Sequence, residues 1–177
     1  MKFVDKIKAR VIDNYENEGV TIAFLGDSVT QGCFEVFKKR DGHINTIFDK
    51  DNAYHAHLAK IFSVVYPTIP VNMINAGISG DNAVHGLSRL DRDILRHDPD
   101  LVVVCFGLND AAEGADRLPA YEAALKKIFT RIQETGAEVI FMTPNTRSDY
   151  TDYHNANETI EQVIRTVSQG ERDGSNC

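Results

Sequence analysis

Three short segments of the sequence place hydroxyl, amide or carboxyl side chains beside glycine. They are residues 26–32 (GDSVTQG), 75–82 (NAGISGDN) and 107–110 (GLND). Glycine lets the backbone come close to a ligand because it has no Cβ, and the polar groups beside it can bind that ligand or react with it. Ser28, in the first segment, is therefore either the N-cap of a following helix or a nucleophile.

Each of the three segments follows an apolar run that is typical of a buried strand. These runs are residues 21–26, 71–76 and 101–107, and a fourth run covers residues 137–144. In an open parallel sheet, ligands bind beyond the carboxyl ends of the strands. The sequence therefore predicts that the three polar segments meet in one crevice at that edge.

Amphipathic patterns between the runs predict helices. Apolar residues recur at helical spacing in residues 4–15, 54–62, 83–94, 121–132 and 160–167. The polar stretch from 34 to 52 interrupts this alternation and predicts a surface loop. Apolar strands separated by such helices predict a flavodoxin-like α/β fold, a three-layer α/β/α sandwich with a parallel sheet, formed by residues 1–177 as a single domain.

Composition limits the classes of protein to which the chain can belong. Its 177 residues are 42% hydrophobic and 25% charged, as in globular domains, and no apolar stretch is long enough to span a membrane. A net charge of −7 without a basic stripe argues against nucleic-acid binding. The charged N-terminal residues lack the apolar stretch of a signal peptide, so we expect a cytoplasmic protein. Three distant cysteines exclude a disulfide framework or zinc knuckle, and Cys105 is expected to be a buried hydrophobic residue.

The polar segments resemble the first three sequence blocks of the SGNH hydrolases, also called the GDSL-type esterases and lipases. GDSV at 26–29, NAGISG at 75–80 and GLND at 107–110 occur in the family's order, and the resemblance extends over about residues 20–145. Val29 stands where the first block has leucine, which does not affect the nucleophile. The resemblance implies a three-layer sandwich with a five-stranded parallel sheet.

The resemblance also implies roles for individual residues. Ser28 would be the nucleophile, at the start of a helix whose dipole favours negative charge. The backbone N–H groups of Ser28 and Gly80 and the side-chain amide of Asn109 would form the oxyanion hole, where losing one donor typically costs roughly 100- to 1000-fold in rate. Asp27 and Asp110 would orient the loops. No metal ion or cofactor is expected.

The general base that would activate Ser28 is not found in the motif that the family uses for it. SGNH hydrolases take it from a late Asp-x-x-His motif, which is absent here. We therefore expect a domain that is C-terminally truncated relative to the family and lacks its last strand. An exposed sheet edge would then invite pairing with a second chain, so a homodimer is expected.

Another histidine could replace the missing base. His154, with Asp152, is the candidate because it follows the fourth predicted strand, although its spacing is one residue short. The other histidines offer no catalytic or metal-binding constellation; they are His43, His55, His57, His85 and His97.

Two functions are compatible with these residues. The first is a serine esterase that cleaves a small carboxylic ester through an acyl-Ser28 intermediate, for example by deacetylating an acylated carbohydrate. The second is a non-catalytic SGNH-like binding module that lacks the base. A nucleotide or phosphate binder is disfavoured, because the first loop has neither a Walker A lysine nor a G-x-G-x-x-G run. We expect a small-molecule ester as the partner, and neither nucleic acid nor a membrane.

Overall fold

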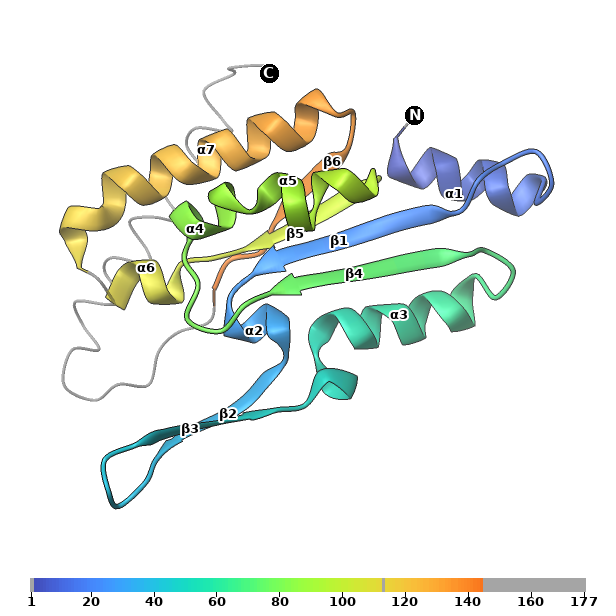
Figure 1. The fold of residues 1–177 in the computed structure, drawn as a ribbon. Helices are drawn as coiled ribbons and strands as arrows, with labels where there is room; N and C mark the ends of the chain where they lie inside the picture. The colour runs from blue at the N-terminus through green and yellow to red at the C-terminus, as the bar shows by residue number, and fades with distance from the viewer. Residues whose placement is uncertain (1, 113, 145–177) are drawn as a thin grey trace.

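The computed structural model describes residues 2–112 and 114–144. Their central sheet consists of β1 (Val20–Gly26), β4 (Val71–Gly77), β5 (Leu101–Cys105) and β6 (Glu138–Phe141). These four strands are parallel and lie in the order β4-β1-β5-β6 (Figure 1). All four overlap the predicted apolar runs, so the predicted parallel α/β sheet is confirmed.

The helices lie between and beside the strands. They are α1 (Phe3–Ile12), α2 (Ser28–Gln31), α3 (Tyr54–Val65), α4 (Ala83–Ser88), α5 (Leu90–Asp93), α6 (Leu108–Ala112) and α7 (Leu118–Glu134), with 3₁₀ turns at η1 (Lys50–Asn52), η2 (Leu95–His97) and η3 (Ala115–Arg117). No helix in the described ranges combines the length and apolar character needed to cross a bilayer.

Helices cover both faces of the sheet, which confirms the three predicted layers. Ala23 and Leu25 of β1 belong to one core, which they share with α4, α5 and α7. Ile22 and Phe24 belong to a second core, which they share with α1 and α3 (Figure 1). Alternate residues of a strand point to opposite faces, so β1 supplies both cores, and this explains why residues 22–25 are all apolar.

The register of the strands brings their carboxyl ends together. Gly26, the last residue of β1, pairs with Gly77 of β4 and with Cys105 of β5. The loops that follow these three strands therefore start side by side at one edge of the sheet. This edge is where the sequence places its three polar segments.

The prediction of a surface loop between residues 34 and 52 is wrong. This stretch forms an antiparallel hairpin of β2 (Cys33–Lys38) and β3 (Ile44–Phe48), which extends away from the central sheet (Figure 1). Both strands mix β-branched and aromatic residues, which favour strand structure, with charged and polar ones. The charged residues obscured this pattern, because the hairpin has no buried face to mark it as a strand; its exposed apolar residues include Phe34, Val36, Ile44 and Ile47.

The helix predicted over residues 83–94 is divided into α4 and α5. Arg89 joins the two with φ −106° and ψ 4°, which is outside the helical range. The helix predicted over residues 160–167 lies outside the described residues.

Candidate active site

The first polar segment forms a tight turn between β1 and α2. The Asp27 carboxylate caps α2 by accepting a hydrogen bond from the Val29 N–H (3.0 Å). The N-cap role therefore belongs to Asp27, and Ser28 is the first residue of α2, partly exposed. The expected support from a helix dipole is wrong, because α2 ends after one turn at Gly32 and a macrodipole requires many aligned peptide units.

The loop that carries Gly80 is tied to this turn by two hydrogen bonds from the residues that precede the glycine. The Ile78 N–H donates to the Gly26 carbonyl oxygen (3.1 Å), and the Ser79 N–H donates to the Gln31 side-chain oxygen (2.7 Å). The Asp81 N–H in turn donates to the Ile78 carbonyl oxygen (3.1 Å). Among the described residues, the Gly80 N–H itself has no acceptor.

Gly80 is required by its backbone conformation and not by crowding. Its φ is +79°, in the left-handed region, and a Cβ there would meet nothing within 4 Å. Gly77 is required for the opposite reason, since a Cβ would lie 2.1 Å from the Gln31 backbone nitrogen. The small residue at 77 lets α2 pack directly on the end of β4, which brings the Ser28 turn beside the Gly80 loop.

The third segment is joined to the second segment and to the start of α4 through both of its polar side chains. The Asn109 Nδ2 donates to the Asp81 carbonyl oxygen (2.7 Å), and the Asp110 Oδ1 accepts from the Ala83 N–H (3.1 Å). The structure therefore brings together the loops of Ser28, Gly80 and Asn109, as the sequence predicts.

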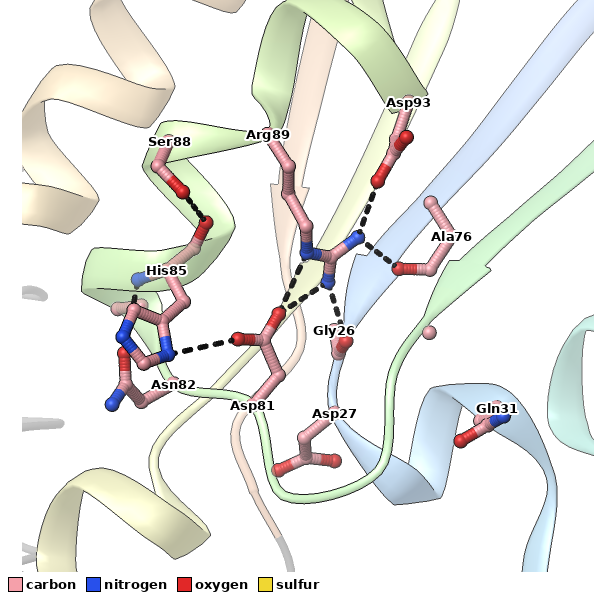
Figure 2. Close-up of polar contacts among 12 residues, drawn as sticks. Gly26, Asp27, Gln31, Ala76, Asp81, Asn82, His85, Ser88, Arg89 and Asp93 are labelled. Atoms are coloured by element: carbon pink, nitrogen blue, oxygen red, sulfur yellow. Dashed lines mark hydrogen bonds and ion pairs between the residues drawn. The ribbon is translucent and has the colours of Figure 1, made fainter.

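An arginine beneath these loops was not among the predicted site residues. Arg89 and Asp81 are 7% and 6% exposed, and the Arg89 Nε donates to the Asp81 Oδ2 (2.7 Å; Figure 2). On its outer side, Asp81 faces the exposed ring of His85, whose Nδ1 lies 3.6 Å from the Asp81 Oδ1. The one sequence signal for Arg89 was its i, i+4 spacing to Asp93, with which it pairs at 3.1 Å. Such a spacing is common on exposed helices, so it does not mark a site.

Burial changes the acidity of two groups near this edge. Asp27 is 1% exposed, and burial raises the pKa of its carboxyl to about 6, an increase opposed by the Val29 N–H and reinforced by the charge of Asp81. Burial also raises the pKa of the Cys105 thiol to about 12, so this cysteine is a neutral hydrophobic residue, as predicted.

The predicted base is the part of the site that the structure does not place. His154 and Asp152 lie outside the described residues. Within residues 2–112 and 114–144, no group of three or more His, Cys, Asp or Glu side chains is arranged to hold a metal ion.

Known proteins with similar sequences include two esterases. The chain is 27% identical over 166 residues to an acetylxylan esterase from Geobacillus stearothermophilus, which covers 85% of this chain and 71% of that protein. It is 36% identical over 86 residues to an arylesterase from Vibrio mimicus, but this match covers 46% of the chain and 42% of the arylesterase.

Solved structures share the fold. A variant of the same acetylxylan esterase matches with a TM-score of 0.65 at 24% identity, over 86% of this chain and 72% of that one. A gut microbial diltiazem-metabolizing enzyme matches with a TM-score of 0.66 at 22% identity, over 86% of this chain and 34% of the enzyme.

The family model for GDSL-like lipases and acylhydrolases matches residues 24–174. The match spans most of the sequence and includes all three polar segments, whose loops meet at the carboxyl edge of the sheet. The chain therefore belongs to the GDSL-like lipase/acylhydrolase family.

Proposed function

We propose that this chain is a serine-dependent carboxylic ester hydrolase with Ser28 as its nucleophile. The observation that carries the proposal is the convergence of Ser28, Gly80 and Asn109 on loops that hydrogen bonds tie to one another. For the Geobacillus acetylxylan esterase, a serine-to-alanine and a histidine-to-alanine variant are both described as catalytic mutants. This description supports a serine mechanism for a chain of the same family.

In the proposed reaction, the Ser28 hydroxyl oxygen attacks the ester carbonyl carbon while a general base takes the hydroxyl proton. The carbonyl oxygen becomes an oxyanion that accepts hydrogen bonds from the N–H groups of Ser28 and Gly80 and from the Asn109 amide. One Nδ2 hydrogen of Asn109 is held by the Asp81 carbonyl, so the other is the one available to the oxyanion. The alcohol then leaves with a proton, and water attacks acyl-Ser28 to release the acid.

The base in this proposal is His154, oriented by Asp152, because no other histidine of the sequence follows the fourth strand. The substrate is an acetyl ester of a carbohydrate, as the acetylxylan esterase relative suggests. The arylesterase relative makes a small aryl acetate a suitable probe.

The test is hydrolysis of p-nitrophenyl acetate by the chain, by Ser28→Ala and by Ser63→Ala. Ser63 is the matched control, because it lies on α3 and its hydroxyl donates to the Lys60 carbonyl oxygen (2.7 Å). We expect Ser28→Ala to lose roughly 1000-fold or more in kcat and Ser63→Ala to keep the wild-type rate. Equal rates in all three proteins would contradict the proposal and favour the non-catalytic binding module.

The same assay examines the base. His154→Ala should lower kcat about as much as Ser28→Ala, because residues that act as a unit are not additive. His43→Ala, in the turn of the hairpin, is the control. A wild-type rate in His154→Ala would remove His154 as the base and leave the role of Ser28 intact.

A further inference from the structure

The guanidinium of Arg89 connects the ends of two strands that carry the proposed site. Its Nη1 donates to the carbonyl oxygen of Ala76 in β4 (2.7 Å), and its Nη2 donates to that of Gly26 in β1 (3.0 Å; Figure 2). The Nη2 also lies 2.6 Å from the Asp81 Oδ2, and the Nη1 lies 3.1 Å from the Asp93 Oδ2. With the Nε bond to Asp81, the guanidinium donates four hydrogen bonds and also forms an ion pair with the Asp81 carboxylate.

We propose that Arg89 is a positioning residue for the ester hydrolysis proposed above, on which this inference rests. Gly26 lies two residues before Ser28, and Asp81 directly follows Gly80. A single buried group therefore sets the spacing between the turn of the nucleophile and the N–H of the oxyanion hole.

The same group also reaches the third oxyanion donor, through one intervening residue. The Asp81 side chain is held by Arg89, while the Asp81 carbonyl oxygen accepts the hydrogen bond from Asn109 (2.7 Å). The Gly26 carbonyl that Arg89 holds also accepts from the Ile78 N–H (3.1 Å), at the start of the Gly80 loop. A shift of Arg89 would therefore move all three donors relative to one another, and oxyanion stabilisation requires donors that are fixed in place.

The geometry requires a guanidinium and not simply a positive charge. The acceptors are two backbone carbonyls and two carboxylates, and a planar fork with five donors can reach all of them together. An ammonium group has three donors on one atom, so lysine at this position could pair with Asp81 but could not hold both strand ends. Arg89→Lys therefore keeps the charge and removes the connection between β1 and β4.

The first test compares Arg89→Lys with Arg92→Lys in the hydrolysis of p-nitrophenyl acetate. Each rate is divided by the amount of protein whose Ser28 has reacted with a fluorophosphonate once labelling is complete. Arg92 is the matched control, because it also pairs with Asp93 (2.6 Å) but is exposed. We expect kcat per labelled site to fall roughly 10- to 100-fold in Arg89→Lys with KM within about twofold, and no change in Arg92→Lys. An unchanged kcat per labelled site would overturn the inference, because a purely structural residue changes only the amount of folded protein.

The second test does not depend on activity. Hydrogen exchange in residues 26–32 and 77–82 should be roughly tenfold faster in Arg89→Lys than in Arg92→Lys, while exchange in α7 stays the same. Unchanged exchange in both loops would overturn the inference even if the wild type hydrolyses no ester. Absent turnover and unlabelled Ser28 in the wild type would instead contradict the proposed function, and exchange would still decide the role of Arg89.

If Arg89→Lys does not fold, Asp81→Asn takes its place in both tests. The asparagine amide keeps an acceptor for Arg89 but lacks the negative charge that holds the guanidinium in place. We therefore expect faster exchange in the same two loops and a drop of about tenfold in kcat per labelled site. Wild-type kcat and exchange in folded Asp81→Asn would overturn the inference.

Discussion

The carboxyl edge of the sheet and the β2–β3 hairpin are both exceptions to the rule that apolar side chains are buried and charged ones exposed, but in opposite ways. At the edge, charged residues are buried, among them Asp27, Asp81 and Arg89. On the hairpin, apolar residues are exposed, with Phe34 at 73% and Ile44 at 70%. Buried polar groups and exposed apolar groups are the informative exceptions in a globular protein, and here they occupy different parts of one chain.

The two regions also differ in how far each contact reaches along the sequence. Arg89 of the edge bonds to Gly26, which is 63 residues away. In the hairpin turn, the Lys39 N–H donates to the His43 carbonyl oxygen (2.7 Å), only four residues on. Replacing an edge residue should therefore affect stability and several loops together, whereas a change in the hairpin should remain local.

The largest expected difference between the regions comes from removing one carboxylate in each. Asp81→Ala leaves the Arg89 charge buried without its closest partner, and we expect it to lower the free energy of unfolding by about 3–5 kcal/mol. Asp41→Ala, in the hairpin turn, removes an exposed carboxylate that accepts from the His43 N–H, and should change it by at most about 1 kcal/mol. Urea denaturation measures both, and equal losses would show that the Arg89–Asp81 pair does not differ from a surface contact.

The second difference is a dependence of stability on pH that comes from a buried carboxyl whose pKa is raised. The folded-state pKa of Asp27, about 6, lies above its ordinary value of 3.8, so the folded protein binds this proton more tightly than the unfolded chain. Its contribution to stability is therefore present below about pH 4 and is lost as the pH rises through 6. Asparagine caps a helix equally well and carries no charge.

We therefore expect Asp27→Asn to match the wild type in stability near pH 4 and to exceed it by about 3 kcal/mol at pH 7. Urea midpoints of both proteins from pH 4 to pH 7 provide the measurement, because the difference between them cancels the other titrating groups. A difference that does not grow with pH would contradict a raised pKa at Asp27.

The third difference concerns close packing. In Gly77→Ala the new Cβ would lie 2.1 Å from the Gln31 backbone nitrogen, and a backbone cannot rotate away as a side chain can. We expect the free energy of unfolding to fall by an amount near the upper end of about 1–3 kcal/mol. We also expect a lower kcat, because α2 carries Ser28 and would be displaced. Gly42→Ala in the hairpin turn meets nothing within 4 Å and should cost about 1 kcal/mol for its φ of +89° without affecting kcat. Equal kcat in the two variants would contradict the proposed coupling of α2 to β4.

The extent to which the sequence predicted each region follows from the same contrast. The runs behind β1 and β5 were recognisable because strands that are buried on both faces consist mainly of apolar residues. The hairpin was missed because strands exposed on both faces mix charged and apolar residues, as loops do.

At the edge, Ser28, Gly80 and Asn109 could be predicted from the sequence because each lies in a segment that follows a strand. Arg89 could not be predicted in this way. The partners of Arg89 include the backbone carbonyls of Gly26 and Ala76, and a carbonyl has no signature in the sequence. Only the register that sets β1 beside β4 brings these oxygens together. The crowding at Gly77 has the same origin, since it depends on a helix from another part of the chain.

The smallest expected effect comes from exchanging one valine for threonine, which has the same shape and adds a hydroxyl. Val36 on the hairpin is 59% exposed, so Val36→Thr should change the free energy of unfolding by less than about 0.5 kcal/mol. Val104 in β5 is fully buried, and the hydroxyl of Val104→Thr should cost about 1–3 kcal/mol. Because the two substitutions are chemically identical, urea denaturation isolates the effect of burial. If Val36→Thr cost as much as Val104→Thr, the apolar surface of the hairpin would be covered in solution, and the contrast between the two regions would no longer hold.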